Sequence, residues 1–256
     1  MTRKPAKFVW YDVMTTDTKA AEKFYCDVVG WTAADSGMPG GAYTLLSAGG
    51  TQIGGLMPVP PDAAAMGARP MWMGYVGVDD VDAHAKKVKA AGGSVKRPPT
   101  DIPGVARFSV VADPHGAAFI IFKGNGEEPK PVARTTPGHI GWHDLRAGNQ
   151  AEAFAFYSKL FGWTKTDALD MGQHGVYQMF ATGGESVGGM MTMMPGTPDP
   201  HWMYFFNVDA IDAARSRVLK GGGAITTDVM QVPGGEWIIQ AKDPQGAGFG
   251  LVAPKR

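Results

Sequence analysis

The chain has 256 residues, and its 24 basic and 24 acidic side chains give a formal net charge of zero at pH 7. A neutral chain lacks the positive surface that recognises nucleic acid or an anionic membrane, and no apolar run of about 18 residues suggests a membrane span. The single cysteine, Cys26, excludes an internal disulfide and a thiolate metal cluster, and together these properties predict a cytoplasmic, two-domain protein without a nucleic-acid or membrane partner.

The first predicted elements are a strand in FVWYDV, residues 8–13, and a helix that Asp17 opens and Gly30 ends. Asp is a favourable N-cap and Gly a favourable C-cap, and the apolar side chains between them recur at helical spacing. The short stretches AYTLL and QIGGLMPV follow as strands. Two strands can be named after this helix and three after the next one, so we interpret the order as roughly β-α-β-β-β in each quarter of the first half.

The same order returns in the second quarter of the chain. Asp80 opens a second helix, two glycines end it, and the strand-like stretches SVKRP, ARFSVVA and AAFIIF come after it. The next segment, KGNGEEPKPVARTTPG, is rich in proline, glycine and charge, so we interpret it as a linker. The predicted domains are residues 1–123 and 138–256, joined by a linker over residues 124–137.

The second half of the sequence repeats the first at an offset of 132 residues, as from Trp10 to Trp142. The segment VWYDVMTTDTKAAEKFYCDVVGW matches GWHDLRAGNQAEAFAFYSKLFGW. After small insertions, AYTLLSAGG matches VYQMFATGG, and IGGLM matches VGGMM. Short links between the strands favour antiparallel pairing, so we expect four related modules, each a sheet with its helix on one face.

These motifs, seen twice in the same order, resemble the vicinal oxygen chelate superfamily of glyoxalases, bleomycin resistance proteins and extradiol dioxygenases. The resemblance rests on TTDTKAAEKFYCDVVGW, VDDVDAHAKKVKAAGG and DPHGAAF, together with their counterparts AGNQAEAFAFYSKLFGW, VDAIDAARSRVLKGGG and DPQGAGF. It implies an α+β fold in which two βαβββ modules form each glyoxalase-like domain, as a curved, mostly antiparallel sheet with helices on its outer face. It also implies that small molecules bind on the concave face of each such cup.

The resemblance also indicates where metal-dependent members place their metal ligands. The corresponding residues are Trp10, Met73 and Ile120 in the first half and Trp142, Met203 and Gly250 in the second. Indole and aliphatic side chains do not ligate divalent metals, and a thioether suits only soft metals. We therefore predict no metal and no other cofactor, with the alternative that histidines elsewhere rebuild a divalent metal site.

Asp12 and Asp144 are the candidate catalytic residues. Each lies two residues after the tryptophan of a first strand, so strand alternation places both side chains on one face, which the resemblance identifies as the concave one. A carboxylate among indoles loses solvation, which favours its protonated form and suits it to act as a general base or to bind an amine or hydroxyl group. The alternative is a structural role, in which the carboxylate accepts a hydrogen bond from a neighbouring strand or an indole.

Aromatic and methionine side chains gather on the strands predicted to line the cups, and they indicate an apolar or planar ligand. The candidate ligand-binding residues are Trp10, Trp72, Tyr75, Arg107, Trp142, Trp202, Phe205 and Trp237. Arg107 would bind an anion in the first half only, because Trp237 takes its place in the second. The alternative for each aromatic residue is a place in the core between modules or domains.

We therefore expect a superfamily member that lacks the usual metal ligands and binds a small hydrophobic or aromatic molecule in Trp- and Met-lined cups, as a monomer or a homodimer. The alternative is an enzyme with lyase, isomerase or dioxygenase-type chemistry. Such an enzyme would use a non-standard metal site or would be metal-free, with Asp12 or Asp144 as a general base. Fold alone does not decide between them, so both interpretations stay open at this point.

Overall fold

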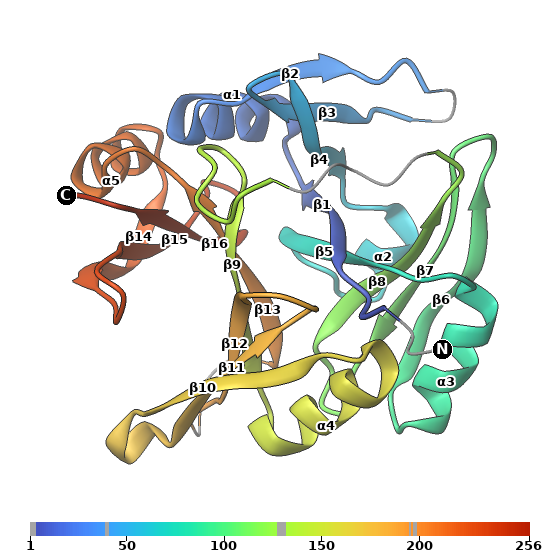
Figure 1. Cartoon of the computed structure of the whole chain (residues 1–256). Coiled ribbons are helices and arrows are strands. Elements are labelled where there is room, and N and C mark those ends of the chain that lie inside the picture. Colours follow the sequence, from blue (N-terminus) through green and yellow to red (C-terminus); the bar gives the residue numbers. More distant parts are fainter. Residues whose placement is uncertain (1–3, 39–40, 127–131, 195, 197–198) are drawn as a thin grey trace. The chain divides into compact units, whose positions relative to one another are not determined.

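The structure is a computed structural model that describes residues 4–38, 41–126, 132–194, 196 and 199–256. Within these residues the order strand, helix, three strands occurs four times, as the repeated motifs predict (Figure 1). The first module consists of β1 (Phe8–Thr15), α1 (Thr18–Val29), β2 (Thr32–Asp35), β3 (Thr44–Ala48) and β4 (Thr51–Pro58). After the short helix α2 (Pro61–Ala65), the second module consists of β5 (Met71–Gly77), α3 (Val81–Ala90), β6 (Ser94–Ile102), β7 (Ala106–Ala112) and β8 (Ala118–Gly124).

The second half of the chain holds the other two modules. The third consists of β9 (Ile140–Ala147), α4 (Gln150–Phe161), β10 (Thr164–Asp170), β11 (Val176–Ala181) and β12 (Ser186–Thr192). The fourth consists of β13 (His201–Asn207), α5 (Ile211–Lys220), β14 (Ala224–Gln231), β15 (Trp237–Lys242) and β16 (Gly248–Ala253). The internal duplication that the sequence shows is therefore a duplication of structure.

The helix caps follow the sequence. Asp17 accepts a hydrogen bond from the backbone N–H of Ala20 at 3.0 Å, and Gly30 ends α1 with a φ of 87°, a left-handed conformation that favours glycine. Asp80 caps α3 in the same way, whereas Ala210 at the matching place gives α5 no side-chain cap. Within the part of the chain that the structure describes, none of these helices combines the length and apolar character that crossing a membrane requires.

The strands form two eight-stranded mixed sheets, one from each half of the sequence. Their orders are β2-β3-β4-β1-β5-β8-β7-β6 and β10-β11-β12-β9-β13-β16-β15-β14. The last three strands of each module reverse direction twice, so neighbouring strands such as β3 and β4 are antiparallel. The helix returns the chain so that β4 runs parallel to β1, and β8 likewise to β5. This α+β arrangement confirms the predicted fold class.

The described chain divides into two compact units, and each unit takes segments from both halves of the sequence. The first unit comprises the described residues of Met1–Trp10, Gly74–Pro131 and His143–Trp202. The second unit comprises those of Tyr11–Met73, Val132–Trp142 and Met203–Arg256. The predicted domain boundaries therefore stay a prediction, because each sheet belongs to one half of the sequence whereas each compact unit draws on both.

The core of the second unit is built around Tyr25 on α1, whose side chain is fully buried. Its hydroxyl group donates to Oδ2 of Asp243 at 3.0 Å and accepts a hydrogen bond from Nε1 of Trp72 at 2.8 Å. The ring of Trp31 stacks on that of Tyr25, and the ring of Phe206 meets it edge-on. Burial raises the pKa of the Asp243 carboxyl group. This Asp–Tyr–Trp relay joins residues of the first, second and fourth modules within one unit.

The first unit repeats the relay with residues of the third, second and fourth modules. The hydroxyl group of Tyr157 on α4 donates to Oδ2 of Asp113 at 3.3 Å and accepts from Nε1 of Trp202 at 3.0 Å. Trp163 stacks on Tyr157, and its Nε1 donates to the carbonyl oxygen of Ala6 at 2.7 Å. Burial also raises the pKa of the Asp113 carboxyl group. The repeated Phe-Tyr and Gly-Trp pairs of the sequence are thus core residues.

Candidate functional site

Asp12 is buried on β1, with 3% of its surface exposed. Its neighbours Tyr11 and Val13 are buried as well, and because adjacent strand residues point to opposite faces, Asp12 lies on the other face of the strand. The hydroxyl group of Tyr43, which directly precedes β3, donates to Oδ1 of Asp12 at 2.7 Å. A phenol–carboxylate hydrogen bond of this length holds the carboxylate in one orientation.

Tyr43 reaches Asp12 because the strand between them carries a glycine. In the order β3-β4-β1, Gly55 on β4 is the register partner of Asp12. A Cβ atom at Gly55 would lie 2.0 Å from the hydroxyl oxygen of Tyr43 and 2.7 Å from Oδ1 of Asp12. A side chain there would therefore displace Tyr43. Sequence reasoning missed Tyr43, although the matching pairs AYTLL with VYQMF and IGGLM with VGGMM contain the tyrosine and the glycine.

Asp144 occupies the matching place on β9 in the first unit, and it is also 3% exposed. Its register partner on β12 is Gly189, and the ring of Tyr177 covers this glycine, since a Cβ atom there would lie 2.1 Å from Cζ of the ring. The ionic partner is Arg146, whose Nη2 lies 3.0 Å from Oδ2 of Asp144. The other oxygen, Oδ1, is buried and has no hydrogen-bond partner among the described residues.

Arg146 is a second site residue that sequence reasoning missed. Its Nη1 donates to the thioether sulfur of Met191 on β12, and 26% of its side chain is exposed. The matching residues of the first half are Met14 and Met57. The difference between Met14 and Arg146 is visible in the alignment of the two halves, but only the structure shows that the guanidinium turns toward Asp144.

The residues at the metal positions of the resemblance do not form a donor set for a divalent metal. Phe205 and Gly250 are register partners on β13 and β16, and a Cβ atom at Gly250 would lie 2.3 Å from Cδ1 of Phe205. The phenyl ring therefore fills the space that a carboxylate side chain at position 250 would need. In the first half, Ile120 is the apolar register partner of Tyr75. Among the described residues, no group of three or more His, Cys, Asp or Glu side chains is arranged to hold a metal ion.

A mostly buried apolar cluster in the second unit combines strands of the fourth module with Trp142 on β9 of the third. Met203, Phe205 and Val252 form a buried cluster, and the partly buried Trp142 and Ile238 pack against it. The guanidinium carbon of Arg134 lies 5.8 Å from the centre of the Trp142 ring, and Nη1 of Arg134 pairs with Oε2 of Glu236 at 3.1 Å. We call Met203, Phe205, Val252, Trp142 and Ile238 the Trp142 face.

Two of the predicted ligand-binding tryptophans belong to the cores instead. Trp72 and Trp202 are 2% and 5% exposed, and their indole N–H groups donate to the tyrosines of the two relays. Trp72 lies three residues before Tyr75 on β5, and Trp202 lies three residues before Phe205 on β13. Because side chains alternate along a strand, each tryptophan points to the opposite face from that residue. The structure thus places Trp72 and Trp202 in the two relays, on the strand faces opposite to Tyr75 and Phe205.

Arg107 pairs with the protein's own carboxylates. Its Nε lies 2.7 Å from Oδ2 of Asp82, and its Nη1 lies 2.8 Å from Oδ1 of Asp101. The hydrogen bond from Arg107 lowers the pKa of the Asp82 carboxyl group. In the second half the matching residue is Trp237, and the guanidinium carbon of Arg256 lies 5.2 Å from the centre of its ring. Both positions thus take part in contacts at the surface of their modules.

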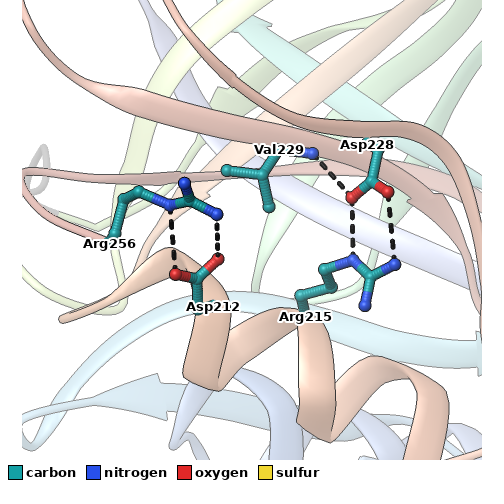
Figure 2. A pocket seen from close by; sticks show the side chains of 5 residues that line it. All are labelled: Asp212, Arg215, Asp228, Val229 and Arg256. Carbon is teal, nitrogen blue, oxygen red and sulfur yellow. Dashed lines mark hydrogen bonds and ion pairs between the residues drawn. The ribbon is translucent and has the colours of Figure 1, made fainter.

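A polar pocket of about 370 Å³ lies beside α5 and β14 (Figure 2). Arg215 pairs with Asp228 at 2.7 Å, and Arg256 pairs with Asp212 at 3.1 Å. Because each guanidinium faces a carboxylate, the charges of the lining compensate one another (Figure 2). A second pocket, of about 280 Å³, lies between α1 and the strands β2 and β3, and Tyr43 contributes to its lining.

His143 follows Trp142 on β9 and is buried in the first unit. Its Nδ1 lies 2.7 Å from the carbonyl oxygen of Val187, and its ring stacks on that of Phe8 at 4.2 Å. Burial lowers the pKa of His143 to about 4, so the imidazole is neutral at pH 7. These contacts give it a packing role.

Comparison with known proteins gives matches over nearly the whole chain. A family model described as Glyoxalase/Bleomycin resistance protein/Dioxygenase superfamily matches residues 7–121 and 136–251. A protein of Mycobacterium tuberculosis (strain CDC 1551 / Oshkosh), which carries the provisional name glyoxylase CFP32, is 35% identical over 96% of this chain and 94% of its own length. The anthracycline biosynthesis protein DnrV of Streptomyces peucetius is 32% identical over 98% of this chain and 95% of its own length.

The solved structures agree with this in fold. The Mn(II)-bound glyoxalase from Novosphingobium aromaticivorans superposes with a TM-score of 0.64 at 17% sequence identity, over 98% of this chain and 82% of that one. At this identity the similarity concerns the fold alone.

Proposed function

The chain belongs to the glyoxalase/bleomycin resistance protein/dioxygenase superfamily, and from this premise we propose that it binds a small hydrophobic or aromatic molecule on faces lined by Trp and Met side chains. The observation that carries the proposal is the Trp142 face, in which the partly exposed indole of Trp142 packs against the buried cluster of Met203, Phe205 and Val252. Indole, phenyl and thioether groups form a polarisable surface that suits a planar ligand.

The contacts of Trp142 support this proposal further. Arg134 lies over the ring and is itself held by Glu236, so the indole is fixed in orientation before a ligand arrives. A surface that is ordered in advance loses less conformational entropy on binding. In the first half, the partly buried Trp10 on β1 is the counterpart of Trp142, and Tyr75 packs edge-on against Phe122.

The proposed ligand contacts are therefore fewer than the sequence suggested. They comprise Trp10, Tyr75, Trp142, Phe205 and Trp237. We set aside Trp72 and Trp202 because their indole N–H groups donate to the relay tyrosines, and Arg107 because it pairs with Asp82 and Asp101. The proposal includes a small-molecule partner, no metal, a cytoplasmic location, and a monomeric or homodimeric protein.

The curated relatives favour an aromatic ligand. The relative named anthracycline biosynthesis protein DnrV is 32% identical across nearly the whole chain. Anthracyclines contain a planar system of fused rings, and a surface of indole, phenyl and thioether groups suits such a system. A fused-ring quinone is accordingly our first choice of probe.

A second candidate function is metal-free proton transfer, because each half holds a buried carboxylate on its first strand. Asp144 suits this function better than Asp12, since its Oδ1 has no hydrogen-bond partner among the described residues, whereas Tyr43 occupies Oδ1 of Asp12. A carboxylate oxygen in this state is able to accept a proton from a bound substrate. The relative named glyoxylase CFP32 fits an enzyme of this kind. If turnover of a carbonyl substrate is found, Asp144→Asn is expected to abolish it while ligand binding persists.

The binding proposal is tested by isothermal titration of the full chain with 2-methylanthraquinone. We expect saturable binding that Trp142→Ala weakens about tenfold, which corresponds to about 1.4 kcal/mol. Met66→Ala, which removes an exposed methionine far from the Trp142 face in sequence, is the control and is expected to leave the affinity unchanged. Absence of saturable binding, or equal affinity for Trp142→Ala and the native chain, would contradict the proposal.

A further inference from the structure

The carboxylate of Asp144 has an unusual environment for a buried acid. Only 4% of its side chain is exposed, and Oδ1 has no hydrogen-bond partner among the described residues. Burying an acceptor without a donor is unfavourable, so such atoms in folded proteins commonly mark a place where another molecule supplies the donor. Asp144 is therefore an acceptor that the chain itself leaves incomplete.

Arg146 supplies the complementary donor next to that acceptor. Its Nη2 lies 3.0 Å from Oδ2 of Asp144, whereas its Nη1 donates to the sulfur of Met191. A thioether is a weak acceptor, so an oxygen atom of a ligand would replace it readily. With 26% of its side chain exposed, Arg146 also connects the buried carboxylate to the surface.

The first half lacks this pair although it shares the backbone. Met14 stands where Arg146 stands in the second half, and the hydroxyl group of Tyr43 already donates to Oδ1 of Asp12. Oδ1 of Asp12 therefore accepts a hydrogen bond from the chain itself, whereas Oδ1 of Asp144 accepts none from the described residues. Only Asp144 has an arginine two residues further along its strand. A purely structural role would be expected in both copies of the duplicated strand. The presence of the Asp144–Arg146 pair in one half only therefore favours a role in recognition.

We infer that Asp144 and Arg146 recognise a hydroxyl group on an aromatic ligand. A hydroxyl group donates one hydrogen bond, to Oδ1 of Asp144, and accepts one from Arg146 in the place of Met191. The thioether of Met191 and the ring of Tyr177, which lies over Gly189, provide apolar contacts beside the pair. An ether lacks the donor, a carboxylate would be repelled by Asp144 and an ammonium group by Arg146, so the ligand class is a benzylic alcohol or a phenol. This inference rests on the proposed function in taking the ligand to be aromatic. Its own contacts all lie in the first unit, and it makes no use of the Trp142 face, which belongs to the second.

The test compares two probes that differ in a single hydrogen-bond donor. The affinities of 2-(hydroxymethyl)anthraquinone and of its methyl ether are measured by isothermal titration against the native chain. We expect the alcohol to bind about tenfold more tightly, because its hydroxyl group donates to a charged acceptor. Arg146→Met, which copies the first half, and Asp144→Asn are each expected to reduce this preference to about twofold or less.

Arg215→Met is the matched control, since it removes another arginine that pairs with an aspartate, and it is expected to keep the preference. Asp144→Asn conserves the shape of the side chain and carries the test if Arg146→Met does not fold. Equal affinity for the two probes, or an unchanged preference in both variants, overturns the inference while the proposed function stands. If neither probe binds, the proposed function fails, and the inference falls with it.

Discussion

Asp12 in the first half and Asp144 in the second occupy the same place on a first strand, but they have different partners. The hydroxyl group of Tyr43 donates to Asp12, and the guanidinium of Arg146 pairs with Asp144. In both halves a glycine on the neighbouring strand makes room for a tyrosine ring. A single difference, Met14 against Arg146, thus changes the chemistry of one face while the backbone stays the same.

The cores of the two compact units, in contrast, are built from the same residue types. Each contains a relay in which a buried tyrosine donates to an aspartate and accepts from a tryptophan, at distances between 2.8 and 3.3 Å. The residue types are the same in both units, and both carboxyl groups have a raised pKa because of burial. The packing of the two cores is therefore the same in both copies, whereas the candidate sites around Asp12 and Asp144 differ.

The largest loss of stability is expected at the two relays, and comparing the two losses tests whether the relays are equivalent. Trp72→Ala and Trp202→Ala each remove a buried indole, and we expect each to lower the free energy of unfolding by about 3–5 kcal/mol. Urea-induced unfolding followed by far-UV circular dichroism measures the loss. Trp237→Ala, at a partly exposed indole, serves as the control with a smaller loss. A loss at one relay only would break the equivalence of the two cores.

A smaller effect is expected where the tyrosine ring crosses its glycine. Gly55→Ala places a Cβ atom against the hydroxyl oxygen of Tyr43, so we expect a loss of about 1–3 kcal/mol from overpacking. Gly189→Ala is expected to cost a similar amount, because its Cβ atom meets the ring of Tyr177. Gly184→Ala, where no atom lies within 4 Å of the added carbon, is the control. If both variants melt at the same temperature as the native chain, the contacts of the two tyrosine rings do not contribute to stability.

The buried aspartates of the relays predict a pH dependence of stability. Burial raises the pKa of Asp113 and Asp243 in the folded chain. Their contribution to the free energy of unfolding is therefore fully present below the unfolded pKa of about 3.9, and it is lost as the pH rises through the folded pKa. Relative to Asp243→Asn, the native chain is expected to lose stability from about pH 4 upward. Urea midpoints measured across this range check the trend, and a constant difference would contradict it.

The smallest effect is expected at the exposed ion pairs that differ between the halves. Arg107→Met and Arg215→Met each remove a surface pair with an aspartate, and we expect each to lower the free energy of unfolding far less than the relay variants do, because solvent screens such pairs. The loss is expected to shrink further at high salt, because screening weakens such pairs. Chemical denaturation at low and at high salt measures the loss of stability and its dependence on salt. A loss comparable to that of the relay tryptophans would show that Arg107 has a role beyond its ion pairs.

Much of the fold could be predicted because its signals are local. The cap at Asp17, the left-handed Gly30 and the recurrence of helical and strand-like stretches depend on neighbouring residues alone. The division into compact units could not be predicted in this way. It depends on contacts between segments far apart in the sequence, such as the hydrogen bond from Tyr25 to Asp243.

The candidate site was predicted less completely than the fold. Asp12 and Asp144 are buried on the first strands, but Tyr43 and Arg146 were missed, since strand register and side-chain direction decide which groups meet. The sequence analysis also grouped Trp72 with Tyr75, although strand alternation puts these two residues on opposite faces.

The most direct test of the central claim is a crystal structure of the chain with 2-(hydroxymethyl)anthraquinone bound. We expect the hydroxyl oxygen of the ligand to lie within about 2.5–3.2 Å of Oδ1 of Asp144 and of a guanidinium nitrogen of Arg146. A ligand whose hydroxyl group contacts Asp12 instead, or contacts neither aspartate, would contradict the claim that the second half alone recognises this group.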